Sequence, residues 1–168
     1  LRERLFAAAA PGPISHIVIT QGHFDHIGGG NVLREPSTEI VAHRGASYDA
    51  PENTVASQEL AWKHGADAAE FDVRRTKDGQ LAIMHDTTTK RTTGRDAKFA
   101  DLTLAELRTL DAGSWKDPKF AGEKVPTFDE MLRHIAPGKR VVVHIYTGLD
   151  STADVAAAIR RNQLTPRQ

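Results

Sequence analysis

Short apolar segments of strand length alternate along this chain with segments that carry helix-start signals, and this alternation limits the fold more than any other feature. The expected strands are residues 15–20, 38–42, 68–74, 81–84 and 141–145, and the expected helices are residues 55–64, 104–110, 128–135 and 151–161. Strands and helices in alternation form βαβ units, whose right-handed crossovers build a parallel sheet. The sequence therefore predicts an α/β fold.

Composition excludes several classes of protein. Lys and Arg number 22 and Asp and Glu also number 22, so no overall positive field exists to hold nucleic acid. The chain has no cysteine, which excludes disulfides, a thiolate zinc site and a thiol nucleophile. No apolar run approaches the ~18 residues of a membrane span, and no signal peptide is visible at the start. The sequence does not decide the cellular compartment, and it slightly favours the cytoplasm.

Polar side chains follow three successive expected strands. Glu70 and Asp72 are two residues apart on one strand, so both carboxylates point to the same face, where they suit a hard cation such as Mg²⁺ or Ca²⁺. The alternative is that one acid faces solvent and the other pairs with Arg74 or Arg75. The segments His43-Arg44 and His85-Asp86 close the strands on either side. Sites of α/β proteins form at such strand ends, so these groups predict a functional site.

This combination of groups suits the cleavage of a phosphodiester. A cation polarises a phosphoryl oxygen, a guanidinium binds phosphate in a bidentate fork, and two imidazoles serve as base and acid near neutral pH.

Eight short motifs in order then carry a resemblance to a known family. They are His43-Arg-Gly45, Pro51-Glu-Asn-Thr54, Glu70-Phe-Asp72, Thr76-Lys-Asp-Gly79, His85-Asp86, Arg91-Thr-Thr-Gly94, Leu110-Asp-Ala-Gly113 and Val125-Pro-Thr-Phe128. From about Glu39 to the end the chain resembles the glycerophosphodiester phosphodiesterases. The resemblance implies a TIM barrel that hydrolyses glycerophosphodiesters to glycerol 3-phosphate and an alcohol with a divalent cation.

The resemblance also implies roles for individual residues. By motif, His43 and His85 correspond to the acid/base pair and Arg44 to the phosphate ligand. Glu70 and Asp72 correspond to metal ligands. The polar stretch 87–123 resembles the insertion of the family, which shapes the glycerol end of the site.

Two features depart from the family pattern. Where the family usually has I-E-I-K, the chain has Val143-His-Ile-Tyr146, so His144 replaces a metal-binding Glu and makes Mn²⁺ or Zn²⁺ an alternative cation. The other interpretation is that His144 fills the barrel and hydrogen-bonds Tyr146. The second departure is length, since residues 39–168 hold about four βα units, whereas a complete barrel takes about 250 residues. A half-barrel exposes strand edges and invites a homodimer or a partner chain that completes it.

Residues 14–36 resemble a different family. His23, Asp25 and His26 follow an expected strand and resemble the H-x-H-x-D-H loop of the metallo-β-lactamase fold, with Gln21 in place of the first His. They form a second, weaker candidate metal site. We expect residues 1–36 to be a remnant of that fold that adds a strand, loop and helix to a barrel domain at 37–168, and that covers its open edge with the extra strand.

Three functions remain open from the sequence. The first is metal-dependent glycerophosphodiester hydrolysis. The second is an impaired half-barrel that binds a metal, a phosphorylated ligand or a partner chain without turnover. The third is a zinc hydrolase of metallo-β-lactamase type, in which changing His23 abolishes activity and changing His85 does not.

Overall fold

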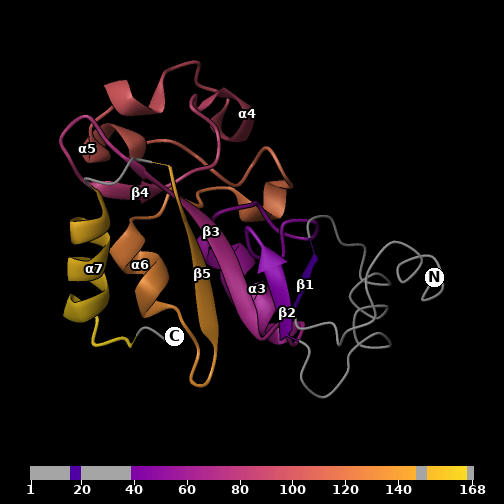
Figure 1. Ribbon diagram of the computed structural model, residues 1–168. Helices are drawn as coiled ribbons and strands as arrows, with labels where there is room; N and C mark the ends of the chain where they lie inside the picture. The colour runs from indigo at the N-terminus through magenta and orange to yellow at the C-terminus, as the bar shows by residue number, and fades with distance from the viewer. Residues whose placement is uncertain (1–15, 20–38, 147–150, 166–168) are drawn as a thin grey trace, which may run out of the picture.

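The computed structural model describes residues 16–19, 39–146 and 151–165, and its strands form one sheet (Figure 1). The strands are β1 (His16–Ile19), β2 (Glu39–His43), β3 (Ala68–Arg75), β4 (Leu81–Ile83) and β5 (Arg140–Ile145). Parallel pairing joins β1 to β2, β2 to β3 and β3 to β5. The predicted α/β fold with a parallel sheet is thus confirmed, and the sheet is part of a TIM barrel.

Helices connect these strands, and four of them lie where the sequence predicts a helix, whereas the short α4 was not predicted. They are α3 (Val55–Lys63), α4 (Lys90–Thr93), α5 (Leu104–Leu107), α6 (Phe128–Arg133) and α7 (Thr152–Arg161), with 3₁₀ turns η1 (Phe99–Asp101) and η2 (Pro118–Phe120). Thr54, Thr103 and Thr127 each accept a hydrogen bond from the backbone N–H three residues on, in a reciprocal capping box. The expected helix starts at residues 55, 104 and 128 are thus confirmed.

The main hydrophobic core lies between one face of the sheet and the helices α6 and α7. Phe71 and Val73 of β3 are fully buried there, beside Phe128 and Met131 of α6 and Val155 of α7. The Phe71 and Phe128 rings meet edge to face with their centroids 6.0 Å apart. Because side chains alternate along a strand, Glu70 and Asp72 point away from this core, toward the inner face of the barrel.

One strand differs from its expected place. Residues 81–83 form a strand as predicted, but β4 runs antiparallel to β3, with Val73 opposite Ile83, and so is not one of the parallel barrel strands. The chain turns back too soon after β3 for a parallel crossover, which needs a dozen or more residues. β2 pairs with Ala68–Glu70 along one edge of β3, and β5 pairs along the other edge of β3. β4 therefore lies on the same edge of β3 as β2, beyond the point where β2 ends.

The N-terminal segment supplies the extra strand expected of it. β1 pairs with β2 in parallel from His16 opposite Glu39 to Ile19 opposite Ala42, so it covers the edge of β2. Among the described residues no helix is both long and apolar enough to cross a membrane.

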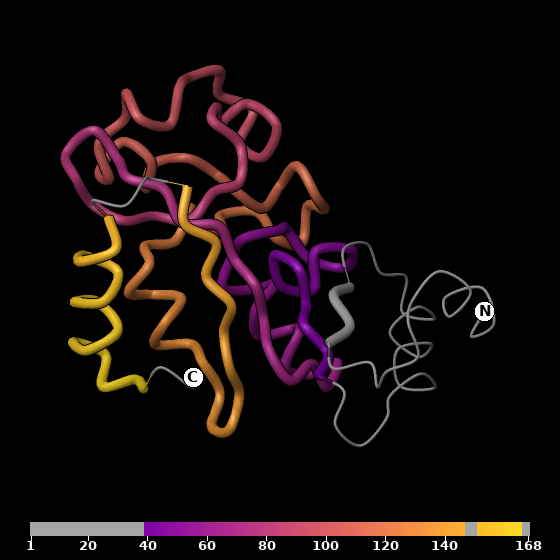
Figure 2. Tube along the Cα trace, viewed as in Figure 1, coloured from indigo at the N-terminus to yellow at the C-terminus, as the bar shows by residue number. Residues whose placement is uncertain are grey.

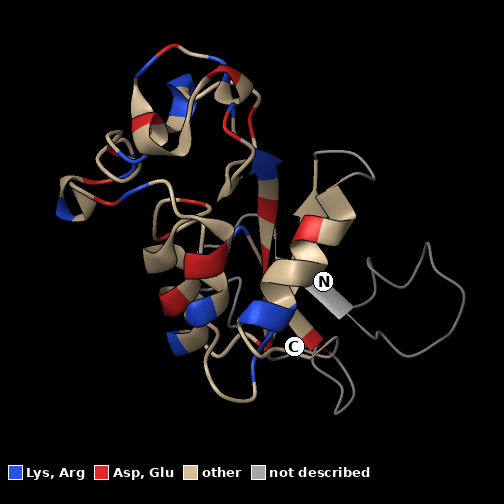
Figure 3. Cartoon of the chain, turned by 90° about the vertical axis from the view of Figure 1, so that its left-hand side faces the viewer, with Lys and Arg blue, Asp and Glu red and all other residues tan. Residues whose placement is uncertain are grey.

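The segment 87–123 lies beyond the carboxyl ends of the strands, at the top of Figures 1 and 2. Phe99, Leu102, Leu107 and Leu110 of this segment belong to a second apolar cluster, which also contains Met84 just after β4. Basic and acidic residues are interspersed along it, as Figure 3 shows. The insertion is thus a packed unit placed over the end of the sheet where the site residues lie.

Candidate active site

Strand register brings the predicted site residues to one end of the inner face. His43 is opposite Glu70 across β2 and β3, and Asp72 is opposite His144 across β3 and β5. Residues opposite each other in a sheet point to the same face, so all four side chains lie on the inner face. The structure therefore places together groups that lie about a hundred residues apart in sequence.

Glu70, Asp72 and His144 form a group that suits a metal ion. One ligand atom from each lies within 4.8 Å of the other two. His144 Nδ1 is 3.4 Å from Asp72 Oδ1. That Asp72 oxygen is buried and has no hydrogen-bond partner among the described residues. A buried carboxylate oxygen without a partner is costly, and a cation between the three groups would satisfy it, so these residues fit a divalent cation.

Backbone and side-chain donors fix the two carboxylates. The backbone N–H of Arg44 donates to Glu70 Oε2 at 3.0 Å, and the Asn53 amide donates to Asp72 Oδ2 at 2.8 Å. Asn53 Oδ1 also accepts from the backbone N–H of Asp72 at 3.2 Å. Both holding residues have a positive φ, 57° at Arg44 and 58° at Asn53, a conformation that side chains disfavour. The loop after β2 is thus strained where it holds the carboxylates.

The environment shifts the protonation of Glu70. Burial, and after it the charge of Asp72, raise the pKa of Glu70 to about 7, against the hydrogen bond and charge of Arg44. A proton on Glu70 therefore competes with any cation at neutral pH.

The two predicted acid/base histidines lie at the same end of the sheet as the carboxylates. His43 Nε2 is 3.8 Å from Glu70 Oε2. His85 follows β4 and meets the Tyr146 ring edge to face, with centroids 5.7 Å apart, while Tyr146 lies 4.1 Å from the His144 ring. The antiparallel course of β4 brings His85 back beside β3. The backbone hydrogen bond from Met84 N–H, next to His85, to Asp72 O shows this position.

Arg44 lies at the centre of the site. Its Nε is 3.3 Å from Asp72 Oδ2, and its Nη1 is 3.0 Å from Glu52 Oε1. Only 17% of its side chain is exposed. A guanidinium held this way beside the carboxylate pair is suited to bind a phosphate group.

Two expectations of simple structural roles are wrong. Arg74 does not pair with Glu70 or Asp72, since its guanidinium donates to the carbonyls of Met84 and His85 and lies 4.4 Å from the Tyr146 ring centre. Arg75 instead pairs with Asp154 of α7 at 2.6 Å. His144 makes no hydrogen bond to Tyr146 among the described residues, since the two rings stack with their centroids 4.1 Å apart, and 54% of the His144 side chain is exposed.

Sequence reasoning missed three residues that connect the site. Glu52 and Asn53 belong to the motif Pro51-Glu-Asn-Thr54 and Arg91 to Arg91-Thr-Thr-Gly94, and neither motif gave them a role. The side-chain contacts show what each one does, whereas the positions alone do not. The second candidate metal site, His23, Asp25 and His26, lies outside the described residues.

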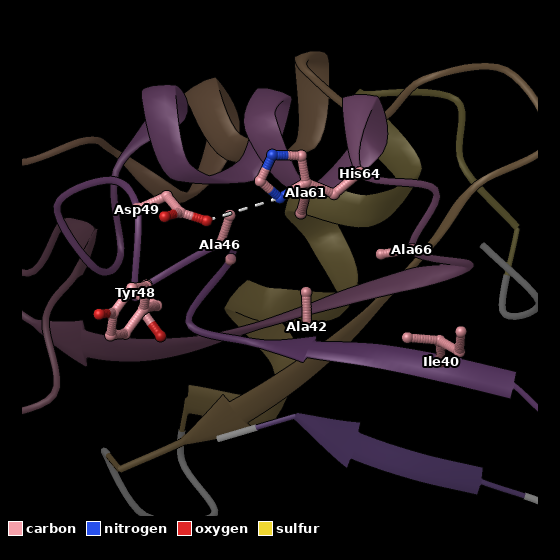
Figure 4. Close-up of a pocket in the computed structure, with 10 residues that line it drawn as sticks. Ile40, Ala42, Ala46, Tyr48, Asp49, Ala61, His64 and Ala66 are labelled. Atoms are coloured by element: carbon pink, nitrogen blue, oxygen red, sulfur yellow. Dashed lines mark ion pairs between the residues drawn. The ribbon is translucent and has the colours of Figure 1, made fainter. Parts of the chain in front are cut away.

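An apolar pocket lies elsewhere, on the outer face of β2 (Figure 4). Ile40 and Ala42 of β2 form its floor and Ala61 and His64 belong to α3 and its end. His64 Nδ1 is 3.8 Å from Asp49 Oδ2 at its rim. Because Ala42 pairs with Ala69 and not with Glu70, this pocket opens on the face opposite the carboxylates and is no part of the site.

Comparison with known proteins decides the family. The model of the Glycerophosphoryl diester phosphodiesterase family matches residues 43–163. The chain belongs to this family. It is 47% identical over 98 residues to the glycerophosphodiester phosphodiesterase of Caldanaerobacter subterraneus subsp. tengcongensis, covering 58% of this chain and 40% of that protein.

Solved structures of family members match the fold as well. The glycerophosphodiester phosphodiesterase of Agrobacterium tumefaciens aligns with a TM-score of 0.72 at 40% identity, over 77% of this chain and 55% of its own. A phosphodiesterase of Oleispira antarctica, in complex with the product sn-glycerol-3-phosphate, aligns with a TM-score of 0.70 at 33% identity, over 76% and 53%. The chain thus spans 40–55% of the length of these three family members.

Proposed function

We propose that this site hydrolyses glycerophosphodiesters to glycerol 3-phosphate and an alcohol. The observation that carries the proposal is the convergence of two histidines, a guanidinium and a carboxylate pair at one end of the inner face. The product in the Oleispira structure supports the same substrate class.

Glu70, Asp72 and His144 would hold one divalent cation, which when bound polarises a phosphoryl oxygen. Two carboxylates favour Mg²⁺ or Ca²⁺, whereas the imidazole of His144 also suits Mn²⁺ or Zn²⁺. We infer that the mixed ligand set broadens the range of cations that the site accepts.

The side chains divide the remaining work. Arg44 binds and orients the phosphate, and His43 and His85 carry the two proton transfers. One imidazole takes a proton from the attacking water as its oxygen bonds to phosphorus. The other gives a proton to the alcohol oxygen as the phosphorus–oxygen bond to the alcohol breaks.

We propose further that the inner face of β5 is covered in the active assembly by a second copy of the chain or by a partner chain. Among the described strands β5 pairs with β3 alone, and Val142 on its inner face is 47% exposed. Apolar side chains at a free strand edge favour association.

The test is release of glycerol 3-phosphate from glycerophosphocholine and glycerophosphoethanolamine, with and without Mg²⁺, Ca²⁺, Mn²⁺ or Zn²⁺. We expect cation-dependent turnover that Glu70→Ala and His85→Ala each reduce by at least about 100-fold. The control is Glu59→Ala, which removes an exposed carboxylate paired with His134 and leaves turnover unchanged. No turnover by a folded, assembled sample would contradict the proposal.

The exposure of β5 favours one second candidate, a half-barrel that binds the cation without turnover. Saturable cation binding, lost in Glu70→Ala, together with no release of glycerol 3-phosphate, would identify it.

A further inference from the structure

Arg91 of the insertion donates hydrogen bonds from all three guanidinium nitrogens to two carboxylates. Its Nε and Nη2 donate to the two oxygens of Asp86 at 2.7 and 3.1 Å. Its Nη1 and Nη2 donate to the two oxygens of Glu52 at 2.8 and 2.7 Å. Two bidentate pairs on one side chain fix both carboxylates in position and orientation.

Each of these carboxylates also contacts a residue of the proposed machinery. Asp86 Oδ1 lies 2.8 Å from His85 Nδ1. Glu52 Oε1 accepts from Arg44 Nη1 at 3.0 Å. A continuous series of charged contacts therefore runs from His85 through Asp86, Arg91 and Glu52 to Arg44.

The pairing with Asp86 selects one tautomer of His85. The hydrogen bonds of Arg91, the largest cause, hold the pKa of Asp86 down at about 2, despite partial burial. An ionised carboxylate only accepts hydrogen bonds, so Nδ1 of His85 carries the hydrogen and Nε2 is left to exchange a proton.

We propose that Arg91 is a positioning residue that orients His85 through Asp86 and Arg44 through Glu52, and so couples the insertion to the site. The inference rests on the proposed function for the roles of His85 and Arg44. Within the described part of the chain Arg91 makes no hydrogen bond or ion pair with His85 or Arg44, so it acts through the two carboxylates. Since 43% of its side chain is exposed, we expect its charge to contribute little to stability and its geometry to matter more.

The experiment compares Arg91→Met and Arg91→Lys with Lys90→Met in the full chain. Lys90 lies next to Arg91 on α4, and its one ion pair with a described residue is with Asp96 at 3.0 Å, where both side chains are about two-thirds exposed. We expect Arg91→Met to lower kcat for glycerophosphocholine by about 10–100-fold, the effect of misplacing a catalytic group by about 1 Å. Arg91→Lys regains part of the activity because an ammonium holds one carboxylate, and Lys90→Met behaves like the parent.

A second readout needs neither turnover nor a cation. The ¹⁵N chemical shifts of His85 in the metal-free protein report which ring nitrogen carries hydrogen. We expect the Nδ1–H tautomer in the parent and in Lys90→Met, and a mixture of tautomers in Arg91→Met, with unchanged circular dichroism.

The two readouts separate the proposals. The role of Arg91 would be overturned if Arg91→Met had the same His85 chemical shifts and the same kcat as Lys90→Met. An Nε2–H tautomer of His85 in the parent would also overturn it. A parent without turnover contradicts the proposed hydrolysis, and the ¹⁵N shifts still decide whether Arg91 orients His85.

Discussion

The two sides of the candidate site are built differently. On β3 the carboxylate side, formed by Glu70 and Asp72 with their holders Arg44 and Asn53, is enclosed, with Glu70 8% and Asp72 1% exposed. On β5 the open side, formed by Val142, His144 and Tyr146, is accessible, with Val142 47% and Tyr146 38% exposed. Both strands pack their other face against the same core, and this face is fully buried on β3 and partly buried on β5. The difference shows that local contacts fix the positions of the cation ligands on β3. The position of the His144 side chain depends instead on what covers the inner face of β5.

The largest effect that distinguishes the two sides is expected from Asn53→Ala. The substitution removes both hydrogen bonds to Asp72 and forces alanine into a positive φ, so we expect a loss of about 2–4 kcal/mol in the free energy of unfolding, measured with urea. Asn53→Gly loses the amide but relaxes the backbone and should lose less. Equal losses in the two variants would show that the strained φ is not part of the cost.

The pH dependence of stability is expected to come from the carboxylate side. Because the pKa of Glu70 rises from 4.5 to about 7 on folding, its contribution is fully present below pH 4.5 and is lost as the pH rises through 7. We expect the metal-free protein to lose about 1–3 kcal/mol between pH 5 and pH 8. Thermal unfolding at several pH values measures the loss, and Glu70→Gln should flatten the curve. A divalent cation at pH 8 should restore stability by binding the folded state. A slope that persists in Glu70→Gln would assign the effect to another group.

On the open side, His144→Glu tests the choice of cation. A third carboxylate at this position should tighten Mg²⁺ and Ca²⁺ binding by about 10-fold or more and weaken the relative preference for Zn²⁺, as isothermal titration calorimetry can measure. An unchanged order of affinities would mean that His144 is not a ligand and that the cation sits on β3 alone.

The smallest effect is expected at Val142. Val142→Thr should change the free energy of unfolding by no more than about 0.5 kcal/mol, because the side chain is half exposed. The matched change Val73→Thr, at a fully buried position of the core face, should cost about 1–3 kcal/mol. A large loss in Val142→Thr that grows with protein concentration would show that this face is covered by another chain.

Much of the fold could be predicted from the sequence because its signals are local. Strand-length apolar runs and the capping residues Thr103 and Thr127 place the elements correctly. The antiparallel course of β4 was also present in the sequence, since the turn Lys77-Asp78-Gly79 is too short for a parallel crossover. The parallel direction expected for residues 81–84 was therefore wrong.

Less of the site could be predicted because its contacts cross between elements. The positions of His43, Glu70, Asp72 and His85 follow from strand ends, and the structure brings them together. The partner of Asn53 depends on how the loop after β2 folds over β3, which no residue pattern within the loop specifies. The exposure of His144 is likewise a property of the assembled sheet, so it could not be read from residue types.

The β3–β4 hairpin has a consequence for the order in which the molecule folds. Val73 pairs with Ile83 across a short turn, whereas Asp72 pairs with His144 across most of the barrel sequence. A hairpin forms in about 1–10 μs, while pairings between distant segments must first bear the entropy of closing a long loop. His85 is therefore expected to reach its place beside β3 early, before β5 adds His144. The site is thus assembled first from residues that are close to β3 in sequence and then from residues that are distant from it.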